Sequence, residues 1–275
     1  MTRIALFQST TGIDPGANAS ALAGAVQQAA SGGAEILFTP EMSGLLDRDS
    51  ARAAKVLREE EQDKVLRAVR AAAAEQRIWV HIGSLAVLVD DGKVANRSFV
   101  IDREGNVRAT YDKIHLFDVD LPTGESWRES NVYSPGKGPV LVNGTPIGKV
   151  GLTICYDLRF PGLFARLAES DADVIAVPAA FTVPTGKAHW HVLLRARAIE
   201  AGLFVVAAAQ VGQHEDGRHT FGHSLVVDPW GEILLDMCEE KDVGFAEIDL
   251  KRISDVRSRI PALNHRLPIA DAVTL

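Results

Sequence analysis

The chain is poor in cysteine. Only two of its 275 residues are cysteines, Cys155 and Cys238, and they are not spaced as a disulfide framework or a metal-binding motif. Long apolar runs are also missing, since no run approaches the roughly 18 residues that a membrane-spanning helix needs. A disulfide-stapled domain and a membrane protein are therefore not expected, and the cysteine usage fits the reducing cytoplasm.

Positive charge is in the minority. The chain has 29 lysines and arginines against 36 aspartates and glutamates, which leaves a net charge of −7. A nucleic acid is therefore a poor candidate partner, because it is itself a polyanion. The apolar stretch in MTRIALFQSTTG is too short for the hydrophobic region of a signal peptide, so we expect a cytoplasmic protein with no membrane partner.

Apolar residues, in contrast, make up 47% of the chain, enough for a large core. Short apolar stretches with strand character alternate with helical stretches, a pattern typical of the α/β class. No linker rich in proline, glycine or serine divides the chain. We expect one domain over residues 1–275, with a loop-like tail from about residue 255 to 275 that docks against another subunit. The expected helices and three of the expected strands are Ala19–Ala30, Val56–Ala74, Gly162–Glu169, His189–Ala201, Ile36–Thr39, Lys149–Cys155 and Phe204–Gln210.

Two segments resemble each other. AEILFTPE at 34–41 and ADVIAVPA at 172–179 each run from a small and an acidic residue through apolar or small residues to a proline. Each follows a helical stretch that itself follows an apolar strand. The similarity favours two related strand–helix–strand halves, with chance similarity as the competing explanation.

Cys155 lies in KVGLTICYDLRFPG, where a β-branched apolar run turns polar. A thiol at the end of a buried strand can face a pocket and attack a carbonyl, although a buried cysteine can also act as a small apolar packing residue. Cys238, in DMCEEKD, is expected to be an inert surface thiol.

A nucleophilic thiol needs a base and a donor for the oxyanion. Glu41 follows Pro40 at the end of an apolar strand, a placement that mirrors Cys155, but it could equally be a solvated loop carboxylate. Lys113, in TYDKIHLFD, is a candidate cation, with a surface lysine as the alternative. The backbone N–H of Tyr156 is a second candidate donor, and no histidine is singled out by spacing.

Three separated motifs, LFTPEMSG, YDKIHLFDVDLP and VGLTICYDLRFPG, occur in the order found in the nitrilase superfamily of carbon–nitrogen hydrolases. The chain resembles this family, and within it the Nit-type amidases, over nearly its whole length. The resemblance implies a catalytic set of Glu41, Lys113 and Cys155, joined by Glu129, with Glu125 as a less well placed competitor. It also implies a four-layer α-β-β-α sandwich, a homodimer or larger homo-oligomer, and no metal or organic cofactor.

Arg159 suits a substrate carboxylate because its guanidinium is a planar fork, and a salt bridge with Asp157 or with a helix carboxylate is the alternative. Phe181, Thr185 and His189 follow the second of the two similar segments and are candidates to line a pocket with Arg159. Within the family, CYDLRFP and the later segments LLRARAIEAGLFVVAAAQVGQH and GHSLVVDPWG are most similar to amidases that cleave deaminated glutathione. Those enzymes release 2-oxoglutarate and cysteinylglycine through a thioester. Alternatives are an omega-amidase acting on 2-oxoglutaramate, an N-carbamoyl amino-acid hydrolase, a nitrilase, and, outside hydrolases, a partner-binding protein or a thiol redox sensor.

Overall fold

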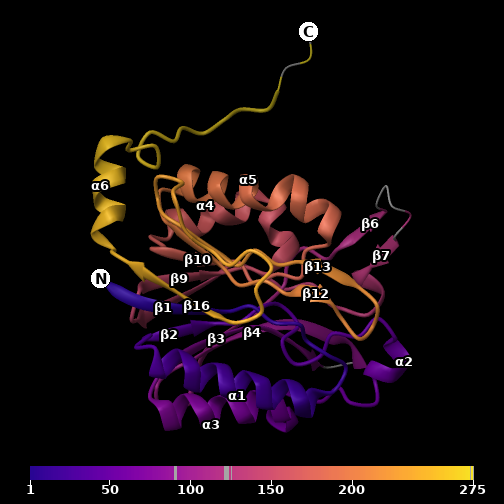
Figure 1. The fold of residues 1–275 in the computed structure, drawn as a ribbon. Helices are drawn as coiled ribbons and strands as arrows, with labels where there is room; N and C mark the ends of the chain where they lie inside the picture. The colour runs from indigo at the N-terminus through magenta and orange to yellow at the C-terminus, as the bar shows by residue number, and fades with distance from the viewer. Residues whose placement is uncertain (90–91, 121–123, 125, 273, 275) are drawn as a thin grey trace.

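In the computed structural model, which describes residues 1–89, 92–120, 124, 126–272 and 274, two six-stranded sheets pack face to face (Figure 1). Helices α1 (Pro15–Ser31) and α3 (Lys64–Gln76) cover the outer face of the first sheet. In spatial order, its strands are β16 (Val243–Ile248), β1 (Thr2–Phe7), β2 (Ile36–Phe38), β3 (Trp79–Leu88), β4 (Val94–Ile101) and β5 (Val107–Asp112).

Helices α4 (Pro161–Glu169) and α5 (Val183–Ala201) cover the outer face of the second sheet. The molecule is therefore a four-layer α-β-β-α sandwich, and the fold class expected from the sequence is confirmed. In spatial order, the strands of the second sheet are β15 (Ile233–Asp236), β14 (Leu225–Val227), β11 (Phe204–Ala207), β10 (Val174–Ala176), β9 (Gly148–Leu152) and β8 (Val140–Thr145).

Strand β1 shows how one strand serves two cores. Ile4 and Leu6 belong to the core between the sheets, whereas Ala5 belongs to the core under α1 and α3. Successive side chains of a strand point to opposite faces, so a strand covered on both sides must be apolar throughout. This is why the central strands read as continuous apolar runs rather than as alternating ones.

The two sheets share one strand pattern. In the first, β1, β2 and β3 are parallel and are flanked by antiparallel strands on both sides. In the second, β9, β10 and β11 are parallel and are flanked in the same way. The similar segments at 34–41 and 172–179 contain β2 and β10, the equivalent central strands, so the sequence similarity coincides with a structural repeat.

Several element bounds differ from the expected ones. The helix expected over Val56–Ala74 begins only at Lys64, where the side chain of Asp63 accepts a hydrogen bond from the N–H of Leu66 and caps α3. The strand that was expected to reach Cys155 ends at Leu152, and α5 begins at Val183 rather than at His189. The remaining short elements are α2 (Ser50–Ala53), η1 (Glu60–Gln62), β6 (Asp118–Asp120), β7 (Ser126–Arg128), η3 (Glu129–Asn131), β12 (Val211–Gln213) and β13 (His219–Phe221).

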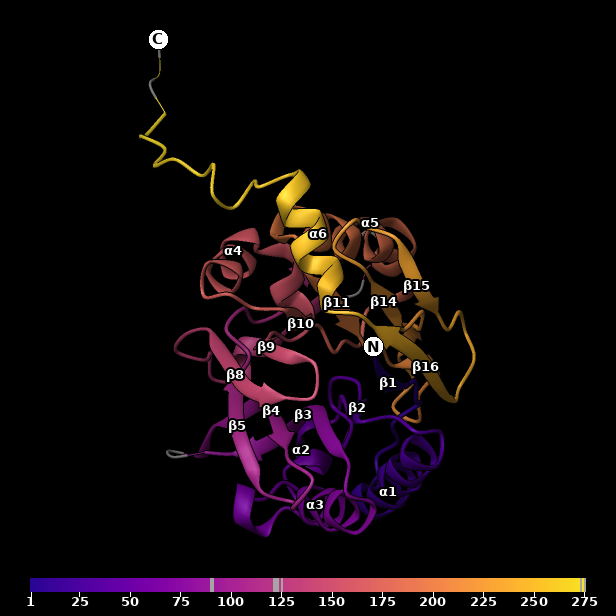
Figure 2. The ribbon, with the colours of Figure 1, turned by 90° about the vertical axis from the view of Figure 1, so that its left-hand side faces the viewer.

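The C-terminal part was expected to be loop-like from about residue 255, but α6 (Lys251–Arg259) continues past that point. Beyond α6 the chain runs away from the sandwich, as both views show (Figures 1 and 2). Within the described residues, none of the helices has the length and apolar character to cross a bilayer.

Candidate active site

A cavity of about 730 Å³ opens where the two halves of the sandwich meet. Its lining includes Glu41, Lys113 and Glu129 from the first half and Cys155 from the second. The four residues that the sequence singled out for catalysis are therefore brought together, although Glu41 and Cys155 are far apart along the chain. Glu125, the competitor of Glu129, lies outside the described residues.

Glu41 follows β2 and is only 4% exposed. Its Oε1 accepts hydrogen bonds from Lys113 Nζ at 3.0 Å and from Asn96 Nδ2 at 2.9 Å. Its Oε2 accepts one from the backbone N–H of Ala180 at 3.0 Å. Donors on three separate segments thus hold this carboxylate in one orientation, and the Ala180 contact joins it to the other half.

Lys113 follows β5 and is buried between two carboxylates. Its Nζ lies 2.9 Å from Glu129 Oε2 and 3.0 Å from Glu41 Oε1. Glu129 also accepts a hydrogen bond from the N–H of Phe117 at 2.7 Å. Buried charges need such pairing, because an isolated ion is strongly destabilised away from water.

Cys155 starts the short 3₁₀ helix η4 (Cys155–Arg159) and has a φ of +48°, in the left-handed region that a residue with a Cβ rarely adopts. Its N–H donates to Pro178 O at 2.8 Å, which holds the turn against the loop after β10. Such backbone strain persists only where the surroundings enforce it, and it often marks functional positions. The side chain lines the cavity, and the residue is 8% exposed.

The charges set the protonation state of the site. Burial alone would raise the pKa of Glu41, but the Lys113 ammonium and hydrogen bonds lower it below its ordinary value. Burial raises the pKa of the Cys155 thiol, and the nearby Glu41 carboxylate raises it further. Burial would lower the pKa of Lys113, but Glu129 and Glu41 hold it well above its usual range. At neutral pH the site therefore contains a thiol, a carboxylate and an ammonium.

Asp157 is fully buried and connects η4, which contains Cys155, to the segment after β5, which contains Lys113. Its Oδ2 accepts hydrogen bonds from the Tyr111 hydroxyl at 2.7 Å and from the Ile154 N–H at 2.9 Å. Its Oδ1 accepts them from the N–H and Nδ1 of His115 at 3.1 and 2.7 Å. These contacts rule out Asp157 as the ion-pair partner of Arg159 and give it a structural task that the sequence did not reveal.

Of the residues expected at the substrate, Tyr156, Arg159, Phe181 and Thr185 line the cavity. The guanidinium carbon of Arg159 lies 5.6 Å from the centre of the ring of Phe181, which lines the same cavity. His189 is not among the lining residues. Its Nδ1 lies 3.3 Å from Nη2 of Arg159, which does line the cavity.

Asn96 in β4 was missed by the sequence reasoning. Its Nδ2 donates to both Glu41 Oε1 and Glu129 Oε1, at 2.9 and 3.1 Å, so it bridges the two carboxylates, as Lys113 does. Asparagine is depleted in strands, so a buried asparagine within the apolar segment VANRSFVI was the available signal.

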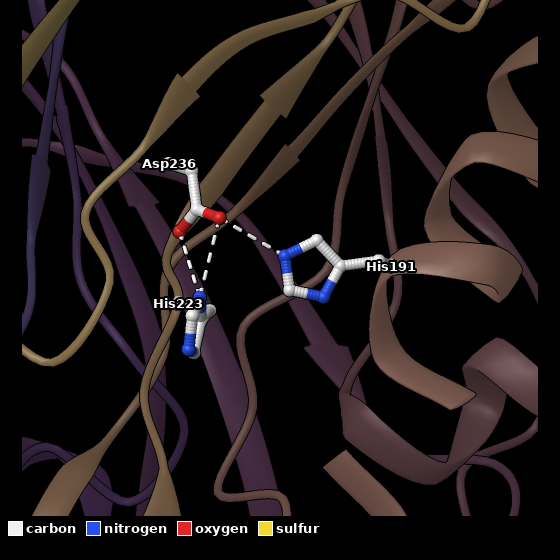
Figure 3. A group of neighbouring side chains, drawn as sticks. All are labelled: His191, His223 and Asp236. Atoms are coloured by element: carbon white, nitrogen blue, oxygen red, sulfur yellow. Dashed lines mark hydrogen bonds and ion pairs between the residues drawn. The ribbon is translucent and has the colours of Figure 1, made fainter. Parts of the chain in front are cut away.

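A separate cluster has the donor atoms of a divalent metal site (Figure 3). His191 Nε2 lies 3.0 Å from Asp236 Oδ2, and His223 Nδ1 lies 2.9 Å from Asp236 Oδ1. The three ligand atoms lie within 4.8 Å of one another. Their mutual hydrogen bonds account for this arrangement, and none of the three residues lines the cavity at Cys155.

Comparisons with known proteins agree on one family. The family model described as carbon-nitrogen hydrolase matches residues 3–258. A deaminated glutathione amidase from Yersinia enterocolitica is 36% identical over 98% of this chain and 94% of its own length. The Caenorhabditis elegans NitFhit structure has a TM-score of 0.89 and 36% identity over 96% of this chain, which spans 65% of that longer chain.

A second similar structure is informative about the cysteine. It is an amidase from Nesterenkonia sp. AN1, in a mutant form, with a TM-score of 0.79 and 25% identity over 95% of this chain and 98% of its own. In that structure, acrylamide has added to the active-site cysteine.

Proposed function

The chain belongs to the carbon-nitrogen hydrolase family and is a hydrolase of amides, and on that premise we propose that Cys155 is its nucleophile, Glu41 its proton carrier and Lys113 its oxyanion donor. One observation carries the proposal. The three side chains converge on one cavity, with Lys113 Nζ 3.0 Å from Glu41 Oε1 and Cys155 close enough to Glu41 for each to shift the pKa of the other.

Acylation begins from a protonated thiol. Glu41 takes the proton of Cys155 while the sulfur attacks the amide carbon, so charge appears on sulfur only as the new C–S bond forms. The carbonyl oxygen becomes an oxyanion, stabilised by the Lys113 ammonium and the N–H of Tyr156. Glu41 then gives its proton to the departing nitrogen, the C–N bond breaks, and a thioester remains on Cys155.

Deacylation uses the same groups. Glu41 removes a proton from a water molecule that attacks the thioester carbon, and the oxyanion forms again beside Lys113. Collapse of this intermediate releases the acid, and the sulfur of Cys155 recovers the proton from Glu41. Glu129 holds Lys113 throughout, because its two oxygens lie 2.9 and 3.2 Å from Nζ.

For the substrate we propose deaminated glutathione, which would be cleaved to 2-oxoglutarate and cysteinylglycine. The proposal is supported by the relatives, which bear this activity in their names. It is also supported by Arg159, which lines the cavity and whose guanidinium suits a carboxylate on the acyl part. Omega-amidase activity on 2-oxoglutaramate and hydrolysis of N-carbamoyl amino acids remain alternatives for the same catalytic set.

The test is amine or ammonia release from deaminated glutathione, 2-oxoglutaramate, an N-carbamoyl amino acid and a simple nitrile. We expect deaminated glutathione to have the highest kcat/KM. Cys155→Ala should abolish turnover without unfolding the protein, whereas Cys238→Ala, which changes the exposed free cysteine, should leave turnover intact. A Cys155→Ala enzyme that still hydrolyses the best substrate would refute the mechanism, and a different best substrate would refute the proposed specificity.

A thiol redox sensor is disfavoured by the same geometry. Sensor cysteines are typically exposed and have a low pKa, whereas Cys155 is buried and its thiol pKa is raised by burial and by Glu41. Its surroundings suit a thiol that loses its proton only during a reaction.

We also propose a cytoplasmic homodimer built from one hydrolase domain per chain. The support is an apolar surface made of Val192 and Ile199 on α5 and Trp230 and Leu234 on the β14–β15 hairpin, all at least 40% exposed. A hypothetical Cβ on Gly231 would lie 2.6 Å from Ile199 Cδ1, so the helix and the hairpin are in contact. A second copy of the chain is the partner that fits, and we propose that the extended tail beyond α6 also contacts it.

A further inference from the structure

The cavity is larger than the chemistry at Cys155 requires. At about 730 Å³ it falls in the range of pockets that enclose drug-sized ligands. Away from the catalytic residues its lining includes Trp127 of β7, Arg48 from the loop before α2, and Arg218 from the loop between β12 and β13. The substrate therefore has room to extend well beyond the amide that is cleaved.

Two arginines converge on the single ring of Trp127. The guanidinium carbon of Arg218 lies 5.0 Å from the ring centre, and that of Arg48 lies 5.4 Å from it. Both distances are within the range of cation–π attraction. The ring offsets part of the repulsion between the two cations and keeps them facing the same part of the cavity.

A nearby carboxylate pairs with Arg218 but leaves most donors of the two guanidinium groups free. Arg218 uses its Nε to donate to Asp216 Oδ2 at 2.8 Å, and its two Nη atoms make no hydrogen bond within the described residues. Among the residues that the structure describes, Arg48 forms no ion pair. Its neighbour Asp47 is bound at 2.6 and 2.7 Å by two nitrogens of Arg52. The cavity thus contains unused guanidinium donors, although the protein as a whole has a net charge of −7.

We propose that Arg48 and Arg218, braced by Trp127, bind a second carboxylate of the substrate, located on the amine that departs. This inference rests on the proposed function, in which Arg159 beside Cys155 binds the acyl carboxylate. Planar guanidinium groups with free donors are the groups that bind carboxylates with two hydrogen bonds. Nothing else among the lining residues supplies two cations on one aromatic ring.

The two cationic sites define a substrate class, namely amides that are anionic on both sides of the scissile bond. Deaminated glutathione has a carboxylate on its oxoglutaryl part and another on its glycine. 2-Oxoglutaramate has only the first, and it releases ammonia. The arginine pair would therefore select long, doubly anionic amides over short ones that share the same acyl group.

The experiment is a cycle that removes the charge from the enzyme and from the substrate in turn. kcat and KM are measured for deaminated glutathione and for its analogue in which the glycine carboxylate is a carboxamide, with the wild type, Arg218→Gln and Arg48→Gln. With the wild type, the carboxamide should have a KM about 10-fold or more higher. With either variant the KM for the acid should rise by a similar factor, and the acid and the carboxamide should become nearly equivalent.

Arg103→Gln is the matched control. Arg103 is exposed and lies beyond the end of β4, whereas Val94, at the start of that strand, lines the cavity. The kcat and KM for both substrates should therefore equal those of the wild type. The subsite is refuted if Arg48→Gln and Arg218→Gln lower kcat/KM equally for the acid and the carboxamide. If the wild type hydrolyses neither substrate, the proposed function fails instead. Arg218→Lys, which keeps the charge, guards against a folding defect in Arg218→Gln and should retain part of the preference for the acid.

Discussion

At the scale of single residues, the site is organised around a thiol that is protonated at rest. Lys113 mainly stabilises the ionised carboxylates of Glu41 and Glu129. Glu41 in turn raises the pKa of the Cys155 thiol. A preformed thiolate beside Glu41 would place two negative charges in one buried pocket. The structure therefore favours transfer of the proton to Glu41 during attack over an ion pair that exists beforehand.

The pH dependence of kcat/KM tests this assignment. Glu41 acts as a base only when it is ionised, and its pKa is lowered by Lys113 and hydrogen bonds despite burial. Activity should therefore persist through mildly acidic pH and fall only as the pH drops below the ordinary glutamate value of about 4.3. Circular dichroism at each pH would separate this loss from unfolding.

Glu41→Gln should abolish the acidic limb along with most activity, since a positioned base is worth about 10²–10⁴ in rate. An acidic limb between pH 6 and 7 in the wild type would contradict the assignment, because it would point to a histidine as the base. His115, which is bonded to Asp157, would then be the first residue to replace.

At the scale of elements, Asp157 connects two pieces of the site. It joins η4, which carries Cys155, to the segment after β5, which carries Lys113. Its carboxylate accepts all of the hydrogen bonds that the side chain makes. An asparagine amide would therefore place an NH₂ donor opposite groups that are themselves donors. Such a buried mismatch leaves groups without partners, each at a cost of about 1–3 kcal/mol.

We expect Asp157→Asn to lower the free energy of unfolding by about 3 kcal/mol and to reduce activity as well, because the distance between the thiol and the ammonium is no longer fixed. Denaturant unfolding measures the first effect. Asp120→Asn is the control, since its side chain is 71% exposed and solvent screens its ion pair with Arg128. Equal stability of the two variants would show that Asp157 does not hold these elements together.

At the scale of the whole molecule, the site lies at the joint between two similar halves. Glu41 follows β2 and the Pro178 turn follows β10, the equivalent strands of the two sheets. The hydrogen bond from Ala180 N–H to Glu41 Oε2 connects these two turns, and the one from Cys155 N–H to Pro178 O connects Cys155 to the second of them. In the proposed mechanism, the first half supplies the acid–base group and the cation, and the second supplies the nucleophile.

The proposed dimer is tested at this scale. Val192 is 68% exposed on α5, and a charge there would have to be buried in the contact. Val192→Glu should therefore shift the mass measured by light scattering from a dimer to a monomer. Ala71→Glu, on the exposed face of α3, is the matched control and should leave the dimer intact. A wild-type protein that is monomeric at micromolar concentration would refute the proposal.

Much of the architecture could be inferred from the order of the residues. Apolar runs such as Ile36–Phe38 and Val174–Ala176 must be buried on both faces, and this requirement alone indicates a sheet covered by helices. Element ends were less predictable, because they depend on single contacts. Asp63 starts α3 by capping it, and the strand before Cys155 stops at Leu152, where the chain turns into the strained start of η4.

The residues of the candidate site also fall into those that the sequence predicted and those that it did not. The identity of the thiol, the carboxylate and the ammonium was readable from three local motifs, since each motif is a short stretch of chain. The roles of Asn96, Asp157 and the Arg48–Trp127–Arg218 group were not, because each depends on partners that are distant in sequence. Hydrogen bonds and cation–π contacts act over a few ångströms, so folding alone determines which distant side chains come within that range, and with it the charge of the pocket.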